Sequence, residues 1–128
     1  MTINMLLDNF YTIDTTTTTD ADSWSVALTL NSEHALYQGH FPGHPVVPGV
    51  CTLQLIKECA EGICGHSLQY TQIGSCKFLS AIDPTQTNKL ELSLTLKETE
   101  KKGVLQLLAE GQTSNGPFIK LKAQLIQR

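Results

Sequence analysis

The chain has 128 residues and a formal net charge of −3; 41% of its residues are hydrophobic and 16% are charged. These values are ordinary for a globular protein, and we interpret residues 1–128 as a single domain with its own core. The acidic balance argues against nucleic-acid binding, which needs a clustered basic surface. No apolar run approaches the ~18 residues of a membrane helix. Residues 1–10 lack the features of a signal peptide, so we expect a cytoplasmic protein.

Two segments with strand character precede the middle of the chain. Residues 11–19 are rich in β-branched side chains, with five successive threonines, and residues 20–22 provide a turn. From Trp24 to Leu30, apolar residues alternate with small and polar ones, which indicates a strand with one buried face. Met1–Phe10 carries only a weak helical signal.

Residues 40–49 form a stiff connector that holds three of the five prolines of the chain. Proline fixes its own φ and pushes the residue before it towards extended geometry, so a helix cannot run through this stretch. The proline-free segment from Val50 to Cys64 is predicted to be a helix that is apolar over most of its circumference, ended by Gly62 and Gly65. Its solvated stripe is expected to consist of Gln54, Lys57, Glu58 and Glu61.

Four further strands are predicted after the helix. They cover residues 68–79, 90–96, 104–114 and 119–125, and the turns between them lie at residues 83–84, 101–103 and 115–116. Two strands, one apolar helix and four antiparallel strands indicate an α+β fold in which the sheet curls around the helix.

The cysteines do not indicate a metal site or a disulfide framework. No Cys-x-x-Cys pair is present, and Cys64 and His66 alone are too few ligands for zinc. We expect reduced cysteines that act as small apolar residues, and no metal or cofactor. The four residues are Cys51, Cys59, Cys64 and Cys76.

The connector from His40 to Gly49 reads His-Phe-Pro-Gly-His-Pro-Val-Val-Pro-Gly. It resembles the signature His-Phe-Pro-Gly-x-Pro-x-x-Pro-Gly of the 3-hydroxyacyl-[acyl carrier protein] dehydratases, and every fixed position is met. The resemblance implies the hotdog fold, an antiparallel sheet wrapped around one central helix. It also implies a hydro-lyase of fatty-acid or related acyl-chain biosynthesis, which eliminates water from a 3-hydroxyacyl chain carried on acyl carrier protein.

This reaction needs a base for the α-proton, donors for the thioester oxygen and an acid for the departing hydroxyl. The resemblance implies that His40 is the base and that the Gly49 backbone N–H binds the thioester oxygen, with Phe41 and Val50 beside the substrate. The acid of the family lies fourteen residues after the histidine, where this chain has Gln54.

A glutamine amide donates hydrogen bonds but cannot transfer a proton. Gln54 therefore either orients a hydroxyl or a water, or is a polar residue of the helix surface without a role in the reaction. Glu58 and His44 are the other candidates for an acid. For Glu58 a place on the solvated helix face is the favoured interpretation, and His44 fills a variable position of the signature.

Three hypotheses remain open from the sequence. The first is a dehydratase-like enzyme, and the second is a hotdog acyl thioesterase in which Gln54 positions a water. The third is a catalytically impaired acyl-binding subunit, or one partner of a heteromeric dehydratase. The resembled family usually forms dimers in which the histidine of one subunit faces the acid of the other. We therefore expect a homodimer or higher multiple, or a heterodimer with an acid-bearing paralogue. Lysines expected to dock the acidic carrier are Lys57, Lys77, Lys101 and Lys102.

Overall fold

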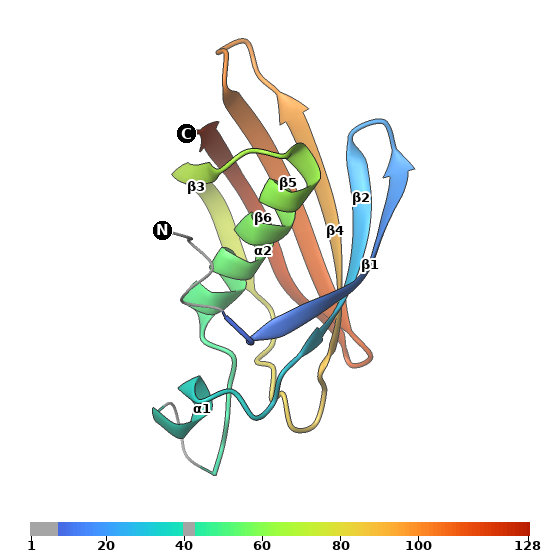
Figure 1. The fold of residues 1–128 in the computed structure, drawn as a ribbon, viewed down its shortest axis with the longest axis vertical. Helices are drawn as coiled ribbons and strands as arrows, with labels where there is room; N and C mark the ends of the chain where they lie inside the picture. Colours follow the sequence, from blue (N-terminus) through green and yellow to red (C-terminus); the bar gives the residue numbers. More distant parts are fainter. Residues whose placement is uncertain (1–7, 40–42) are drawn as a thin grey trace.

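The computed structural model describes residues 8–39 and 43–128; residues 1–7 and 40–42 lie outside the described residues. One long helix, α2 (Gly49–Cys64), lies across one face of a six-stranded sheet, and a short helix, α1 (Leu36–Gly39), precedes it (Figure 1). The strands are β1 (Tyr11–Asp20), β2 (Ser23–Leu30), β3 (Leu68–Phe78), β4 (Lys89–Glu98), β5 (Val104–Thr113) and β6 (Gly116–Gln127).

The strand order in the sheet is β1-β2-β4-β5-β6-β3, and all neighbours are antiparallel. The chain crosses from β2 through α2 to β3, which pairs with β6 at the edge opposite β1. This arrangement confirms the predicted α+β hotdog fold with its central helix. In the described ranges, neither α1 nor α2 has the length and apolarity needed to span a lipid bilayer.

The core lies between α2 and the sheet, and the alternation of the strands explains it. Every second residue of β4 from Leu90 to Leu96, and of β6 from Ile119 to Leu125, is apolar and buried, while the residues between them face outwards. Leu55, Ile56 and Ala60 of α2 are buried against this face. Burial of such side chains is worth about 1.5–3 kcal/mol each for the larger ones, so the alternating strands and the apolar helix stabilise one another.

The expected solvated stripe of α2 is wrong at two positions, since Lys57 and Glu58 are each only 8% exposed. The Lys57 ammonium donates to the Leu68 carbonyl oxygen (3.3 Å) at the start of β3. Glu61 accepts a hydrogen bond from the Leu68 N–H (2.8 Å). The start of the edge strand β3 therefore packs against the helix, and its polar groups pair with the helix side chains, as a buried polar group requires.

The ends of α2 follow the backbone chemistry of proline and glycine. Pro48 is the N-cap with an extended conformation. Gly65 ends the helix with a φ of +77°, a left-handed conformation that glycine adopts without a steric cost, and its N–H donates to the Glu61 carbonyl (2.8 Å). Gly62 lies inside the helix, so only one of the two glycines predicted to end it does so.

The first prediction concerns Gly111 of β5, where no side chain fits. A Cβ there would overlap the ring of Phe118, which is buried, and would lie 3.0 Å from Leu92 Cδ2. Gly111→Ala is expected to lower the free energy of unfolding by about 1–3 kcal/mol, because the Phe118 ring has to move. Urea denaturation followed by circular dichroism measures this change.

Gly74→Ala in β3 is the matched control for this prediction. A Cβ at Gly74 would have only ordinary contacts, the nearest being the Lys122 carbonyl oxygen at 3.5 Å. This variant is expected to keep or slightly raise the free energy of unfolding, because alanine restricts the unfolded chain. Equal stabilities of the two variants would contradict the argument.

Candidate active site

The first turn of α2 presents backbone donors. The N-cap Pro48 makes no side-chain hydrogen bond to the helix, and its carbonyl accepts from the N–H groups of Cys51 (3.0 Å) and Thr52 (3.2 Å). Within the described residues, no acceptor is found for the N–H groups of Gly49 and Val50. Such unpaired donors at the positive end of the helix dipole attract negative charge.

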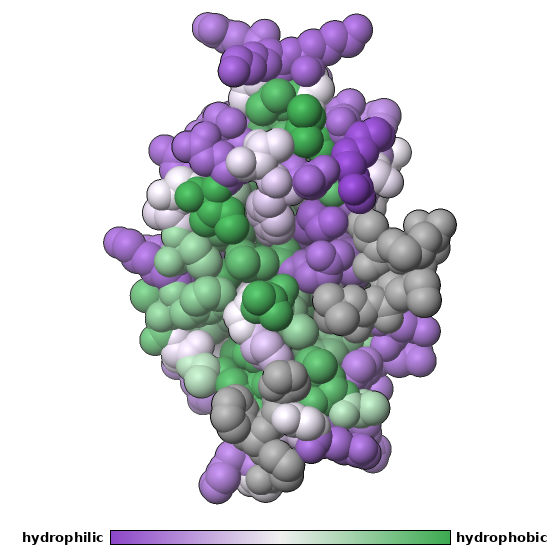
Figure 2. Space-filling model, turned by 90° about the vertical axis from the view of Figure 1, so that its left-hand side faces the viewer, coloured by the Kyte–Doolittle hydropathy of each residue, from purple (hydrophilic) through white to green (hydrophobic). Residues whose placement is uncertain are grey.

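A largely apolar groove of about 320 Å³ lies beside this helix start. Gly49 forms part of its wall, and the ring of Phe78 from β3 approaches so closely that a Cβ at Gly49 would come within 3.0 Å of Phe78 Cζ. Val47, Thr52, Ile82 and Phe118 also line the groove. Figure 2, in which the left-hand side of Figure 1 faces the viewer, shows apolar surface gathered over the middle of that face. The groove is suited to an apolar chain that ends near the free N–H groups.

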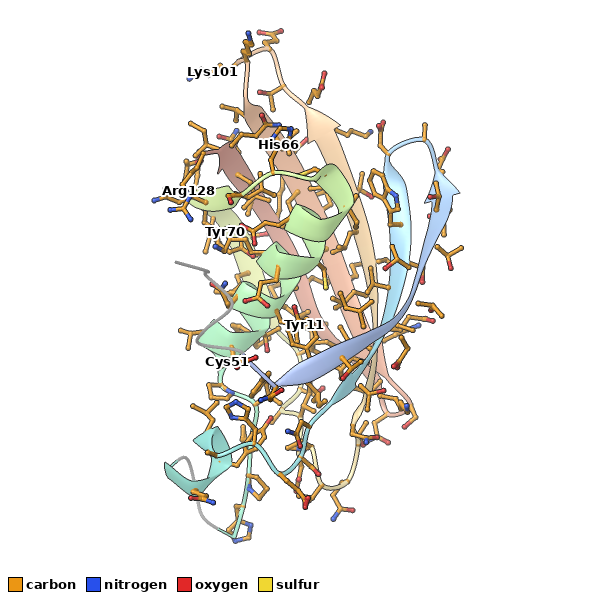
Figure 3. The ribbon with its side chains drawn as sticks, in the orientation of Figure 1. Tyr11, Cys51, His66, Tyr70, Lys101 and Arg128 are labelled. Atoms are coloured by element: carbon orange, nitrogen blue, oxygen red, sulfur yellow. The ribbon has the colours of Figure 1, made fainter. Side chains whose placement is uncertain are left out.

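A network of hydrogen bonds lies further along α2. The Gln54 amide nitrogen Nε2 donates to Glu58 Oε2 (3.0 Å), and the Tyr11 hydroxyl donates to Glu58 Oε1 (2.7 Å). Tyr11 is the first residue of β1 and reaches the helix from a position 47 residues away in the sequence (Figure 3). Burial, together with the hydrogen bond to Glu58, raises the pKa of Tyr11 well above its ordinary value, so its hydroxyl stays a donor at neutral pH.

The structure describes only some of the residues that were predicted for the site. His40 and Phe41 lie outside the described residues. Gly49 and Val50 share the first turn of α2, and Val50 is 70% exposed. His44 is exposed, as expected for a variable position of the signature.

Gln54 is partly exposed, and its partner Glu58 is buried rather than solvated. Both carboxylate oxygens of Glu58 accept hydrogen bonds from protein donors, which is not the environment expected of a free surface carboxylate. Tyr11 was not predicted as part of the site, because nothing at the start of a threonine-rich strand indicates which helix side chain it meets.

The four cysteines are free thiols. Cys51 and Cys59 are buried, as expected for small apolar residues, while Cys64 and Cys76 are partly exposed. Burial raises the pKa of the Cys59 thiol to about 12, so it is protonated and unreactive at neutral pH.

The fold is that of a hotdog protein. Residues 16–116 match the ApeI-like family, described as ApeI dehydratase, and the chain belongs to this family. The 3-hydroxyacyl-[acyl-carrier-protein] dehydratase FabZ of Alkaliphilus metalliredigens is 32% identical over 73 residues, which cover 52% of this chain and 50% of that protein. FabZ of Agrobacterium fabrum is 26% identical over 113 residues, which cover 80% of this chain and 70% of that protein. The chain spans about half the length of the first curated relatives that it matches.

Solved structures support the same fold. The dehydratase heterocomplex ApeI:P from Xenorhabdus doucetiae contains a chain that superposes with a TM-score of 0.71 at 21% identity, covering 91% of this chain and 97% of that chain. A hypothetical thioesterase protein with coenzyme A from Streptococcus pneumoniae has a TM-score of 0.64 at 11% identity, covering 95% of this chain and 90% of that chain. At these identities the similarity establishes the fold only.

The second prediction follows from the raised pKa of Tyr11. The folded state keeps the phenolic proton above the ordinary pKa of 10.0, whereas the unfolded state loses it. The resulting stabilisation is complete below about pH 10 and is lost as the pH rises above it. The free energy of unfolding is therefore expected to fall steeply from about pH 10 upwards, and Tyr11→Phe is expected to make this fall shallower.

Urea denaturation at a series of pH values measures both slopes. Near neutral pH the Tyr11→Phe variant should be less stable by about 1–3 kcal/mol, because a buried carboxylate oxygen loses its donor. Tyr37 and Tyr70 also have pKa values raised by burial, so they keep part of the alkaline slope in the variant. Parallel slopes in the two proteins would contradict the role assigned to Tyr11.

Proposed function

We propose that this protein binds 3-hydroxyacyl thioesters at the start of α2 and eliminates water from them, as a dehydratase-like enzyme of fatty-acid or related acyl-chain biosynthesis. The observation that carries the proposal is the start of α2 beside an apolar groove, where residues 8–39 and 43–128 provide no acceptor for the N–H groups of Gly49 and Val50. Membership of the ApeI-like dehydratase family and the complete signature from His40 to Gly49 support it.

In this proposal the Gly49 N–H binds the thioester oxygen, and His40 removes the α-proton. The electron pair of the C–H bond forms the new double bond, and the C–O bond to the 3-hydroxyl breaks. The leaving hydroxyl needs a proton, and the Gln54 amide cannot transfer one. The proton held by His40 can leave with the hydroxyl as water, which balances the reaction. Because His40 then has to serve as both base and acid, and a separate general acid is typically worth ~10²–10⁴-fold, turnover is expected to be slow.

Acyl carrier protein is the proposed source of the substrate, and the curated relatives are named as dehydratases of 3-hydroxyacyl chains on this carrier. Docking of an acidic carrier needs exposed cations. Lys77, Lys101 and Lys102 are exposed, while the buried Lys57 is removed from the proposed docking set.

We also propose that residues 1–128 act as one domain.

A second candidate is a subunit of a heteromeric dehydratase. Gln54 stands where the family has its acid, and a structural neighbour is a dehydratase heterocomplex. Pairing with an acid-bearing chain would supply a carboxyl group opposite His40. Structural neighbours described as thioesterases have the same fold as this chain, which keeps the thioesterase hypothesis open. The reaction product distinguishes a thioesterase from the two dehydratase candidates.

The third prediction concerns His40 and Gln54. His40→Ala is expected to abolish turnover of 3-hydroxyacyl thioesters, because the α-proton loses its base. Gln54→Glu is expected to raise turnover, by up to ~10²-fold, since it supplies an acid. The Gln54 nitrogen lies 3.0 Å from Glu58 Oε2, so the new carboxyl would have a carboxylate as its neighbour. Two such groups share a proton, and the raised pKa of one keeps it protonated near neutrality.

Combining Gln54→Glu with Glu58→Gln is the matched control. It keeps the new carboxyl but removes the neighbouring charge, so the pKa of the carboxyl falls and the gain should shrink. The assay follows the enoyl product and free thiol in parallel. Release of thiol without enoyl product would favour the thioesterase hypothesis. Brisk turnover by the native protein that slows in Gln54→Glu would refute the argument from the missing acid.

The fourth prediction concerns assembly through the edge strand β3. Ile73 lies opposite Ala123 of β6, whose side chain is buried, so both face the helix side of the sheet. Ile73 is nevertheless 44% exposed, because α2 does not cover β3 at this point. We expect a homodimer or higher multiple in which β3 strands pair and extend the sheet.

Ile73→Lys is expected to shift this assembly to monomers in light scattering at micromolar concentration. Leu108→Lys is the control: Leu108 is 42% exposed, but it lies on β5 in the middle of the sheet and away from the β3 edge. A native protein that is monomeric under these conditions would count against pairing through β3, and would leave the heteromeric hypothesis to be tested with the partner chain.

A further inference from the structure

The outer face of the sheet, away from α2, carries three lysines close together. The side chain of Ile119 is buried on the helix side, so its neighbour Lys120 points to the outer face. Lys77 lies directly opposite Lys120 in the ladder between β3 and β6, and Lys122 follows two residues further along β6. All three side chains are exposed. We name Lys77, Lys120 and Lys122 the outer lysine cluster.

The outer lysine cluster lacks a neutralising partner in the part of the chain that the structure describes. The ion pairs of residues 8–39 and 43–128, which extend to 4.0 Å, lie on α2 and between β1 and β4. Glu110 is opposite Lys120 in the ladder between β5 and β6, but these two residues do not form one of the ion pairs of the described ranges. Like charges directly opposite each other destabilise a sheet. An acidic partner would relieve this repulsion.

A hollow of about 300 Å³ lies beside the cluster on the same face. Small hydroxyl side chains leave this space open, and they belong to Ser75, Ser93 and Thr95. Lys120 and Lys122 line the hollow on one side, and Leu108 of β5 is 42% exposed in it. The face therefore offers cations, hydroxyl groups and one apolar contact, which together suit an acidic protein surface that carries an apolar side chain.

The cluster is close to the groove at the start of α2. Lys77 immediately precedes Phe78, and Lys120 lies about 7 Å along the strand from Phe118; both phenylalanines line the groove. Leu79 follows the last residue of β3, lines the groove as well and is 46% exposed, so the groove is open at this end of the sheet. A phosphopantetheine arm spans about 18 Å when extended, given standard bond lengths. It can therefore reach from the cluster around the end of β3 into the groove.

Lys101 and Lys102 are too far from the groove for such an arm. They lie in the turn between β4 and β5, and residues beside this turn line a hollow together with the last residues of α2. Lys101 is thus beyond the C-terminal end of α2, whereas Cys51 marks the start of the helix (Figure 3). The helix has 16 residues and is about 24 Å long, which exceeds the span of the arm.

We propose that an acidic acyl carrier protein docks on the outer face of β3 and β6, through Lys77, Lys120 and Lys122. The inference rests on the proposed function and deepens it, because it assigns the surface that the carrier contacts. The carrier neutralises the cluster and places an apolar side chain against Leu108, and its arm turns around the end of β3 into the groove. A second copy of this chain does not suit this face, because it would oppose lysines with lysines.

The test uses two probes in which an amide replaces the reactive thioester. One is acyl carrier protein loaded with a 3-hydroxyhexanoyl chain, and the other is the same chain on free pantetheine. Calorimetry at low salt measures the dissociation constants, because exposed charges contribute most there. The double variant Lys120→Glu, Lys122→Glu is expected to bind the loaded carrier roughly 5- to 30-fold more weakly, and to bind the free probe like the native protein.

The double variant Lys101→Glu, Lys102→Glu is the matched comparison, since it makes the same change in net charge at the other end of α2. Its dissociation constant for the loaded carrier is expected to differ from the native value by less than about 2-fold, because charges beyond the screening length contribute little. Raising the salt concentration should weaken carrier binding by the native protein more than by Lys120→Glu, Lys122→Glu. Circular dichroism checks that each variant is folded.

The outcomes separate the inference from the proposed function. Equal weakening of carrier binding by the two double variants would overturn the docking face, since net charge alone would then explain it. Carrier binding that Lys120→Glu, Lys122→Glu leaves unchanged would overturn it as well. Binding of the free probe without binding of the loaded carrier would overturn the inference while the proposed acyl binding stands. Binding of neither probe would overturn the proposed function, and the inference would fall with it.

Discussion

The burial of α2 is the constraint on which the rest of the structure depends. A helix that is apolar over most of its circumference has to be covered on more than one side, and a flat sheet covers only one. The central strands of the sheet lie beneath the helix, and the edge strands β1 and β3 reach its flanks near their first residues, Tyr11 and Leu68 (Figure 1). Leu55, Ile56 and Ala60 face the central strands and are buried there.

The flanks of the helix carry polar groups, so their burial requires partners. On one side Tyr11 of β1 donates to Glu58. On the other side, Lys57 and Glu61 bind the carbonyl and the N–H of Leu68, the first residue of β3. These contacts hold the first residues of the edge strands to the helix. They also restrict the conformations of the Lys57, Glu58 and Glu61 side chains. A functional group placed on such a rigid element is held more accurately than one on a loop.

The arrangement of α2 and β3 connects the candidate active site to the assembly of subunits. The start of α2 offers donors for a developing negative charge, and Gln54 further along offers an amide where the family has an acid. The β3 edge and Ile73 remain uncovered in the single chain. The proposed pairing of a second subunit with this edge would cover that apolar surface. In the proposed heteromeric assembly, the partner supplies a carboxyl group at the position where this chain has Gln54.

The sequence by itself determined the elements, since alternation in the strands, the proline-rich connector and the length of the helix are local patterns. It also determined the family resemblance, because the signature from His40 to Gly49 is continuous in the chain. Only the tertiary structure decided that Glu58 is buried and that Tyr11 binds it. That contact joins residues 47 positions apart, and the periodicity of a helix describes one face of that helix but not the strand that covers it.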